Sequence, residues 1–274
     1  MSQSLLLYRR ADADGDPAEL GERLADRLGA LGVAWGCGVA GYRPGTWSDA
    51  ATRARCTLDL GTPPLEEDRE HPPTAYDGWT AAGLAFKIPL AGPHWHAVEC
   101  YRLVEAALAV DDALAALDEE DTRADGAPSS GPAAWDRARA VWSWERQREA
   151  QAAGLALPRL GRMASVVLWR WRREADAGRP ALAVVEDRRR AGRALLAGVV
   201  AEPDAPIVLP AVDVVLLRTA GGLRLVAGER LAGAPGSDLG AGIRRYAGLA
   251  GLAAAGDLIA PERLRLLADE DWRD

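Results

Sequence analysis

The sequence predicts an α+β protein with an N-terminal α/β sandwich followed by a smaller β-rich module with flanking helices. Segments in residues 1–121 follow the order strand, helix, strand, strand, strand, helix, which suits helices packed on one sheet face. A ferredoxin-like arrangement is one version of this order. A stretch rich in Gly, Pro and Ser follows. We therefore expect an acidic domain at 1–124, a linker at 125–134 and a basic domain at 135–274.

The elements of the first domain are predicted from apolar spacing. The expected strands span residues 4–9, 33–40, 53–60 and 83–90. A helix over 17–31 carries leucines at three- and four-residue steps, and Pro17 suits its first turn. A second helix is expected over 93–121, because apolar residues recur there with the helical period. Residues 61–79 hold four prolines and are expected to form a long loop.

The second domain is expected to be mostly β, with helices at both ends. A Trp- and Arg-rich helix is predicted over 135–153, and a strand over 164–171. Val167, Trp169 and Trp171 alternate on that strand, which places them on an inward face. The remaining expected elements are hairpins of 181–186 with 193–200 and of 207–218 with 223–227, a Gly-rich helix at 239–254 and a last helix from Pro261.

Composition bounds the classes of protein to which the chain can belong. Apolar residues make up 49% of 274 residues, which is typical of a globular protein. A single phenylalanine, and arginine in large excess over lysine, indicate a GC-rich bacterial genome. Three cysteines without a Cys-x-x-Cys motif fit a reducing cytoplasm. The sequence contains no signal peptide and no membrane-spanning run, so we expect a cytoplasmic protein without membrane contact.

Charge is distributed unevenly along the chain. The formal net charge is −7. Residues 1–126 carry 11 basic and 22 acidic side chains, whereas residues 127–274 carry 22 basic and 18 acidic ones. Such an asymmetry supports two domains with different partners.

The candidate catalytic residues of the first domain are His94, His96 and Glu99, with Cys100 beside them. Imidazole and carboxylate groups together can hold zinc or act in catalysis. The pair of histidines sits at a helix start, however, where positions two apart diverge by about 200°. The competing interpretation is that both histidines satisfy backbone groups at the helix entry. We expect no metal and no cofactor.

Residues 36–41 match the Gly-x-Gly-x-x-Gly pattern, and Asp59 follows at the distance of a dinucleotide site. That site needs a helix directly after the glycines, so that the N-terminus of the helix faces the pyrophosphate. Pro44 and Gly45 oppose such a helix. A glycine-rich strand and turn is the favoured interpretation.

Arginines alternate with tryptophans over residues 135–193. This composition occurs at protein interfaces and on surfaces that bind nucleic acid, although the tryptophans would also suit a core. The expected binding residues are Trp142, Trp144, Arg146, Arg188, Arg189 and Arg190. Trp142 and Trp144 diverge by about 200° on a helix, so both cannot face one core.

These observations favour a non-enzymatic binding or assembly subunit of a bacterial cytoplasmic complex, with other protein subunits as partners. The alternative is a nucleic-acid-binding or RNA-processing protein with a ferredoxin-like domain. A weaker alternative is a metal-dependent hydrolase that uses His94, His96 and Glu99.

Overall fold

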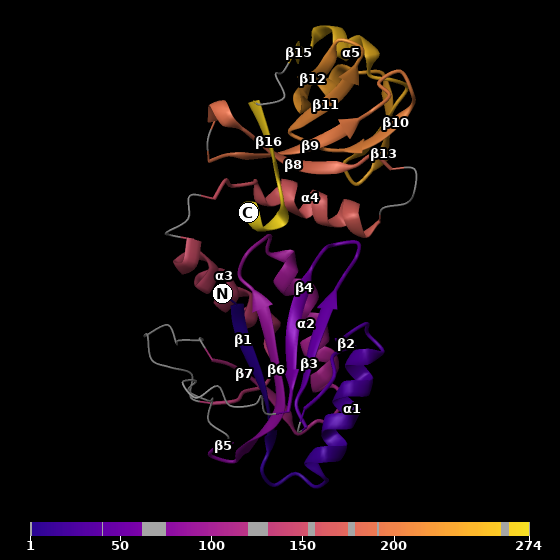
Figure 1. Ribbon diagram of the computed structural model, residues 1–274. Helices are drawn as coiled ribbons and strands as arrows, with labels where there is room; N and C mark the ends of the chain where they lie inside the picture. The colour runs from indigo at the N-terminus through magenta and orange to yellow at the C-terminus, as the bar shows by residue number, and fades with distance from the viewer. Residues whose placement is uncertain are drawn as a thin grey trace. The chain divides into compact units, whose positions relative to one another are not determined.

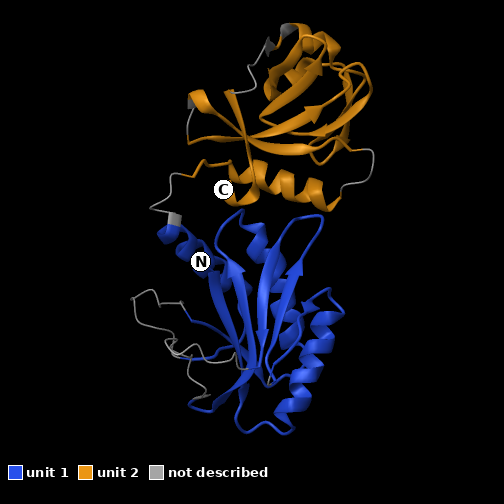
Figure 2. Ribbon diagram, in the orientation of Figure 1, with its two compact units in different colours: residues 1–154 blue, residues 155–274 orange. Residues whose placement is uncertain are grey.

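The chain forms two compact units, residues 1–154 and 155–274 (Figure 2). The computed structural model describes residues 2–39, 41–61, 75–119, 131–152, 157–174, 179–190, 192–258 and 263–273. Helices and several sheets occur together, which confirms the mixed α+β class. None of the described helices is long and apolar enough to cross a membrane.

A seven-stranded antiparallel sheet forms the frame of the first unit (Figure 1). Its strand order is β2-β3-β4-β6-β1-β7, with β5 paired to β6. The strands are β1 (Ser2–Arg10), β2 (Ala34–Trp35), β3 (Arg43–Ser48), β4 (Arg55–Leu60), β5 (Ala75–Tyr76), β6 (Trp79–Pro89) and β7 (Leu114–Asp118). Three helices accompany them: α1 (Pro17–Gly29), α2 (Trp95–Leu108) and α3 (Arg137–Ala152).

The core of the first unit lies between one sheet face and these helices. Alternate residues of the strands point to that face, so Leu5, Leu58 and Phe86 meet across β1, β4 and β6. Buried apolar side chains from all three helices belong to one cluster, including Leu24 of α1 and Trp144 of α3. The predicted helix over 17–31 is confirmed as α1, and the Asp16 side chain caps its first turn.

The predicted helix over 93–121 is wrong in its second half. Helix α2 ends at Leu108, a turn follows at Asp111, and residues 114–118 form edge strand β7. Leu114 and Leu117 fit the helical period, but pairing with β1 places the segment in the sheet. Long-range pairing of this kind leaves no periodic signal in a segment of five residues.

Helix α3, predicted as the start of the second domain, belongs to the first unit. Its Trp144 is fully buried and donates a hydrogen bond from Nε1 to the Pro89 carbonyl oxygen (3.0 Å). The Tyr101 hydroxyl of α2 donates to the Ala140 carbonyl oxygen (2.9 Å). The division between the units thus falls after residue 154 rather than in 125–134, and the first part of that predicted linker lies outside the described residues.

The second unit contains a six-stranded sheet of order β15-β12-β11-β9-β8-β16 and a three-stranded sheet of order β10-β14-β13. Its strands are β8 (Leu182–Asp187), β9 (Ala194–Val200), β10 (Ile207–Pro210), β11 (Val214–Thr219), β12 (Gly222–Ala227), β13 (Gly236–Gly240), β14 (Ile243–Tyr246), β15 (Asp257–Leu258) and β16 (Leu264–Leu267). Its helices are α4 (Arg162–Arg173) and α5 (Ala250–Ala255).

Several predictions for the second unit are confirmed and others are wrong. Strands β8 and β9 pair as a hairpin, and so do β11 and β12, as expected. The expected strand over 207–218 is instead two strands in different sheets. Most of the expected Gly-rich helix at 239–254 is strand and turn, and only its end is α5. The described part of the expected last helix is strand β16 followed by a short 3₁₀ helix.

The segment predicted as a strand at 164–171 is helix α4. Alternation of Val167, Trp169 and Trp171 competes there with a helical pattern, because Leu168 and Trp171 are three positions apart and both are buried. Trp169 is only half-buried and lies under the Arg173 guanidinium. Trp169 and Trp171 therefore point in different directions around a helix and do not share one strand face.

Candidate functional site

The three candidate metal ligands lie at the start of α2. His96 and Glu99 are buried, and the Trp95 ring lies edge-on to both His94 and His96. The Glu99 carboxylate accepts a hydrogen bond from the Arg102 guanidinium (3.0 Å). No group of three His, Cys, Asp or Glu side chains among the described residues is arranged to hold a metal ion. The local geometry therefore gives no support to a metal centre here.

The neighbouring thiol is also poorly suited to catalysis. A hydrogen bond with Cys56, together with burial, raises the pKa of Cys100 well above its ordinary value. The thiol thus stays protonated, whereas a nucleophilic cysteine needs its thiolate form. We conclude that this cysteine pair packs α2 against β4.

The glycine motif at 36–41 does not form a dinucleotide site. Strand β3, not a helix, follows it. A Cβ atom on Gly61 would lie 2.1 Å from the Gly41 carbonyl oxygen, so these glycines let two backbones approach each other. Asp59, which has the spacing of a ribose-binding acid, forms an ion pair with Lys87 (2.5 Å).

Helix α3 carries the predicted binding residues that fall in the first unit. Trp142 is 45% exposed, and the Arg146 guanidinium lies 4.8 Å from the centre of its ring. Trp144 is fully buried, so it is part of the core rather than a binding residue. The predicted divergence of the two tryptophans is confirmed. Among the described residues, Trp142 is the one tryptophan with an exposed side chain.

The other predicted binding residues lie in the second unit. Arg188 and Arg189 are exposed on the 3₁₀ helix Arg188–Arg190, where the backbone N–H of Arg189 donates to Asp187. The side chain of Arg190 lies outside the described residues. The Trp- and Arg-rich stretch of the sequence is therefore divided between two units and does not form one continuous element.

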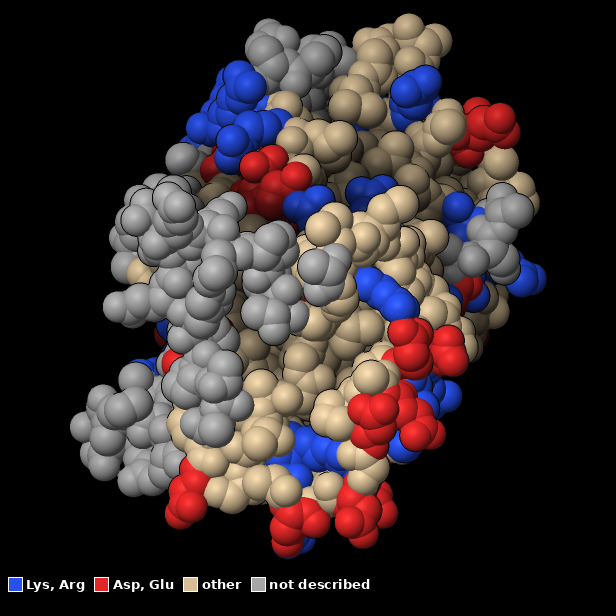
Figure 3. Space-filling model, turned by 60° about the horizontal axis from the view of Figure 1, so that its bottom comes forward, with Lys and Arg blue, Asp and Glu red and all other residues tan. Residues whose placement is uncertain are grey.

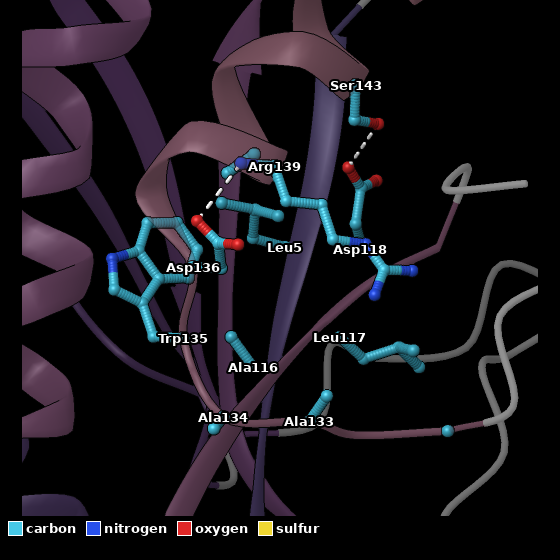
Figure 4. A pocket seen from close by; sticks show the side chains of 12 residues that line it. Leu5, Ala116, Leu117, Asp118, Ala133, Ala134, Trp135, Asp136, Arg139 and Ser143 are labelled. Carbon is cyan, nitrogen blue, oxygen red and sulfur yellow. Dashed lines mark hydrogen bonds between the residues drawn. The ribbon is translucent and has the colours of Figure 1, made fainter. Parts of the chain in front are cut away.

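A pocket of about 240 Å³ lies beside α3, at the β7 edge of the sheet (Figure 4). Strands β1 and β7, the segment that leads into α3 and the first two turns of α3 form its wall. The lining residues are Leu5, Ala116, Leu117, Asp118, Gly131, Ala133, Ala134, Trp135, Asp136, Arg139, Ala140 and Ser143.

The Asp118 carboxylate on the pocket wall accepts hydrogen bonds from amide and hydroxyl donors. Its Oδ2 atom accepts hydrogen bonds from Gln3 Nε2 (2.6 Å) and Ser143 Oγ (2.7 Å), and its Oδ1 atom accepts from Gln147 Nε2 (3.3 Å). Gln3 Oε1 in turn lies 2.7 Å from the Tyr101 hydroxyl oxygen and shares its single proton with the Ala140 carbonyl oxygen. Burial raises the pKa of Tyr101, so this phenol remains a donor. The network fixes the carboxylate in one orientation.

Arg139 connects the pocket with the exposed side of α3. It lines the pocket, and it is three and seven positions from Trp142 and Arg146, so all three share one helix face. We call Arg139, Trp142 and Arg146 the outer face of α3. The outer face and the adjoining pocket form the candidate functional site.

The sequence reasoning missed the pocket residues. The sequence predicts Asp118 near the end of the helix expected over 93–121, and Gln3 carries no recognisable motif. A signal existed in α3, where Arg139, Ser143 and Gln147 recur every four residues and predict a polar stripe beside the buried one. Their partner on β7 could not be identified, because it depends on the pairing of β7 with β1.

Acidic side chains dominate another surface of the first unit. Figure 3 shows them gathered near the end where β1 leads into α1. Asp12, Asp14, Asp16 and Glu19 are all exposed there. Such a surface repels phosphate backbones.

Comparisons of the chain with protein-family models, curated proteins and solved structures found no match.

Proposed function

We propose that the protein is a non-enzymatic binding or assembly subunit and that the outer face of α3 docks a protein partner. The observation that supports this most directly is the exposed Trp142 ring beneath the Arg146 guanidinium. The other large aromatic rings of the first unit are buried or half-buried. The core therefore accommodates aromatic rings, and the exposed Trp142 ring is the exception.

An exposed Trp–Arg pair is suited to protein recognition. Tryptophan and arginine are the residue types most enriched among interface positions that contribute strongly to affinity. A tryptophan ring buries a large area when a partner covers it. The stacked Arg146 guanidinium already restricts the orientation of the Trp142 ring. Trp142 therefore has the character of an anchor for a partner surface.

The described residues favour binding over catalysis. No group of metal ligands occurs among them, and the pKa of the buried Cys100 thiol is raised. The Asp118 carboxylate is oriented by amide and hydroxyl donors, an arrangement that positions an acceptor. A hydrolase that uses His94, His96 and Glu99 has less support from this geometry.

The ferredoxin-like assignment of the first unit is supported by its strand order. Strands β1 and β4 run parallel with β6 between them, and β6 and β7 run parallel with β1 between them. Helix α1 follows β1, and helix α2 connects β6 with β7. This is the connectivity of two split βαβ units, to which the chain adds β2 and β3.

Nucleic-acid binding, the alternative function, receives less support from the first unit. On the sheet face that the three helices do not cover, Lys87 is paired with Asp59 and Tyr8 is 1% exposed. Ferredoxin-like domains that bind RNA stack bases on exposed aromatic rings of the sheet. Neither residue offers a free charge or ring for that purpose.

The proposal is tested by affinity purification from cells that naturally produce the protein. Tagged wild-type chain, Trp142→Ala and Met163→Ala are compared by quantitative mass spectrometry. Met163 is 76% exposed on α4, so its substitution controls for loss of exposed apolar surface. We expect one set of proteins to be retained by wild type and Met163→Ala and lost with Trp142→Ala. Equal recovery with all three chains would contradict the proposal.

A further inference from the structure

We propose that three arginines of the second unit, Arg159, Arg193 and Arg273, bind the phosphoryl group of a small phosphate monoester. We call these three residues the arginine row. The row belongs to the second unit alone, and its ligand is independent of the partner proposed for the outer face of α3.

Three backbone segments hold the arginine row in register. Arg159 forms parallel bridges with Arg193 on one side and with Arg273 on the other. The Arg159 N–H donates to the Gly192 carbonyl oxygen (2.9 Å), and the Arg273 N–H donates to the Pro158 carbonyl oxygen (3.0 Å). Because neighbouring strands lie about 4.8 Å apart, the two outer arginines begin only about 10 Å from each other, with Arg159 between them.

The alternation of buried and exposed residues turns the three arginines to one side. The residue next to each arginine in the chain is buried: Leu160, Ala194 and Trp272. Successive side chains of an extended segment point to opposite faces, so the arginines share the outer face. Arg159 and Arg193 are exposed, and Arg273 is partly exposed. The three long side chains can therefore converge on a ligand from solvent.

The row carries positive charge that the described residues do not neutralise. None of its guanidinium groups forms an ion pair or a hydrogen bond with another described residue, and the buried Nε atom of Arg273 finds no acceptor among them. Like charges directly opposite each other on neighbouring strands are destabilising. A bound anion would remove this repulsion.

Acidic residues flank the row along the chain, but the described ones do not pair with it. The three segments themselves contribute no carboxylate among the described residues. The flanking ion pairs are Asp187 with Arg263, Glu186 with Arg265 and Asp269 with Arg172. Glu270 and Asp271 are exposed on the 3₁₀ helix before Arg273 and form no ion pair with a described residue. Asp274 lies outside the described residues, so a variant of it is included in the test.

The number of guanidinium groups favours a phosphate monoester. Its phosphoryl group carries a charge of about −1.5 to −2 at pH 7 and has three strong acceptor oxygens. A single guanidinium already engages both oxygens of a carboxylate, so three of them exceed what a carboxylate needs. In a phosphoryl group, each of the three guanidinium groups finds an oxygen, and the dianion offsets most of the charge of the row.

Nucleic acid matches the row less well. A backbone phosphate is a diester, which has one charge and only two free oxygens. Proteins that bind single strands add exposed aromatic rings on which the bases stack. None of the tryptophan and tyrosine rings described in the second unit is exposed. The row thus offers a local charge site without a platform for bases.

The direct test titrates the full chain with phenyl phosphate at constant ionic strength and follows backbone amide signals by NMR. We expect saturable shifts centred on Arg159, Ala194 and Arg273. Benzenesulfonate has the same ring and three oxygens with a single charge, and benzoate presents a carboxylate. We expect both to bind at least tenfold more weakly. Equal binding of either compound would overturn the proposed ligand class.

Variants of the row locate the binding. Arg159→Gln and Arg193→Gln each remove one guanidinium group. Arg218→Gln makes the same change at an exposed position of β11, opposite Leu223, and is the control. We expect at least a tenfold loss of phenyl phosphate affinity with the first two variants and none with the third. Unchanged affinity in the row variants would contradict the site.

The stability of the ligand-free variants separates binding from a structural role. Arg159→Gln relieves repulsion with its neighbours, so we expect it to melt no lower than the wild type without phenyl phosphate. Phenyl phosphate should then raise the melting temperature of the wild type and leave that of Arg159→Gln unchanged. Lower melting temperatures of both ligand-free row variants would assign the arginines to folding and would overturn the proposal.

Three further ligand tests exclude other sources of negative charge. Binding of phenyl phosphate to Asp274→Asn but not to the wild type would show that the chain's own carboxylate occupies the row. Tighter binding of a single-stranded RNA hexamer without terminal phosphate, lost in Arg159→Gln, would assign the row to nucleic acid. Tighter binding of phosphatidic acid vesicles, lost in the same variant, would assign it to a membrane. Each of these results would overturn a small phosphate monoester as the ligand.

Discussion

Trp142 and Trp144 are two positions apart on α3 but have opposite surroundings. Trp144 is fully buried with its Nε1 bonded to Pro89, whereas Trp142 is exposed. We expect Trp144→Ala to lower the free energy of unfolding by about 3–5 kcal/mol, through lost burial and a cavity. Trp142→Ala should cost less than about 1 kcal/mol, because it removes only exposed area and a cation–π contact. Urea denaturation of both variants measures the difference. Similar losses would show that Trp142 is a structural residue and not a docking residue.

A substitution of Gly61 tests whether the glycine-rich segment serves the close approach of two backbones. It has φ +85°, and an added Cβ would lie 2.1 Å from the Gly41 carbonyl oxygen. Gly78 has φ +74°, and a Cβ added there would meet no atom within 4 Å, so it serves as a matched control for backbone strain alone. We expect Gly78→Ala to cost about 1–2 kcal/mol. Gly61→Ala should cost clearly more, and the comparison of unfolding free energies measures the backbone clash.

If the two alanine variants were equally stable, the close approach of Gly61 and Gly41 would not be needed for folding. The glycine motif would then require another explanation.

At the scale of elements, two ion pairs join β8 to strand β16 and to Arg263, the residue before it. The Arg263 guanidinium donates to both oxygens of Asp187, and Arg265 pairs with Glu186. Hydrogen bonding from Arg263 lowers the pKa of Asp187 below its ordinary value of 3.8. A carboxyl whose pKa is lowered on folding stabilises the native state above its unfolded pKa, and this contribution is lost as pH falls through the folded pKa.

We therefore expect Arg263→Gln to lower the melting temperature at neutral pH. The difference from wild type should start to shrink as pH falls below 3.8, because the carboxyl of the unfolded chain then takes up a proton. It should vanish once pH has fallen through the lower pKa of Asp187 in the folded wild type. Thermal melts from neutral pH to below 3.8 measure this difference in melting temperature. The variant Arg218→Gln, at an exposed position, is the control for the change of charge. A difference that stays constant at low pH would show that Arg263 acts through packing alone.

The elements differ in how well their sequence predicts them. Helix α1 has a proline in its first turn, an aspartate cap and a leucine stripe, and all three agree. The β8–β9 and β11–β12 hairpins contain long apolar runs separated by charged or glycine turns. The sequences of strand β7 and helix α4 fit both a helical and a strand pattern of apolar residues, so tertiary contacts decide the structure. Segment β7 becomes a strand because it pairs with β1. In α4, the buried Leu168 and Trp171 have helical spacing.

At the scale of the whole molecule, the position of α3 decides where the first unit ends. We expect a fragment of residues 1–154 to unfold cooperatively, because it retains the complete core of the first unit. A fragment of residues 1–134, which ends at the boundary predicted from composition, should not. It lacks Trp144, and it leaves Gln3, Tyr101 and Asp118 without their partners on α3. Circular dichroism during urea denaturation distinguishes the two. A cooperative transition of the shorter fragment would contradict the role of α3 in the core.

The division predicted from composition and the division into compact units differ at α3 for a physical reason. Gly, Pro and Ser in 122–134 mark a loop, but a loop within a unit and a linker between units have the same composition. The contacts of Trp144 and Ala140 with strands and helices far back in the chain distinguish them, and these contacts exist only in the folded state. The divergence of Trp142 from Trp144 could be predicted from helix geometry alone. Which of the two is exposed could not, because that depends on the face that α3 turns to the core.

The most direct test of the account is site-specific photo-crosslinking at the outer face of α3. A benzophenone amino acid replaces Arg146 in one chain and Arg218, exposed on β11, in a control chain. Both are produced in the natural host and irradiated. The account predicts a discrete crosslinked species above the 29.1 kDa chain for position 146, and its loss when Trp142→Ala is added. If position 146 yields no such species, or if the species persists with Trp142→Ala, the outer face of α3 is not a docking surface.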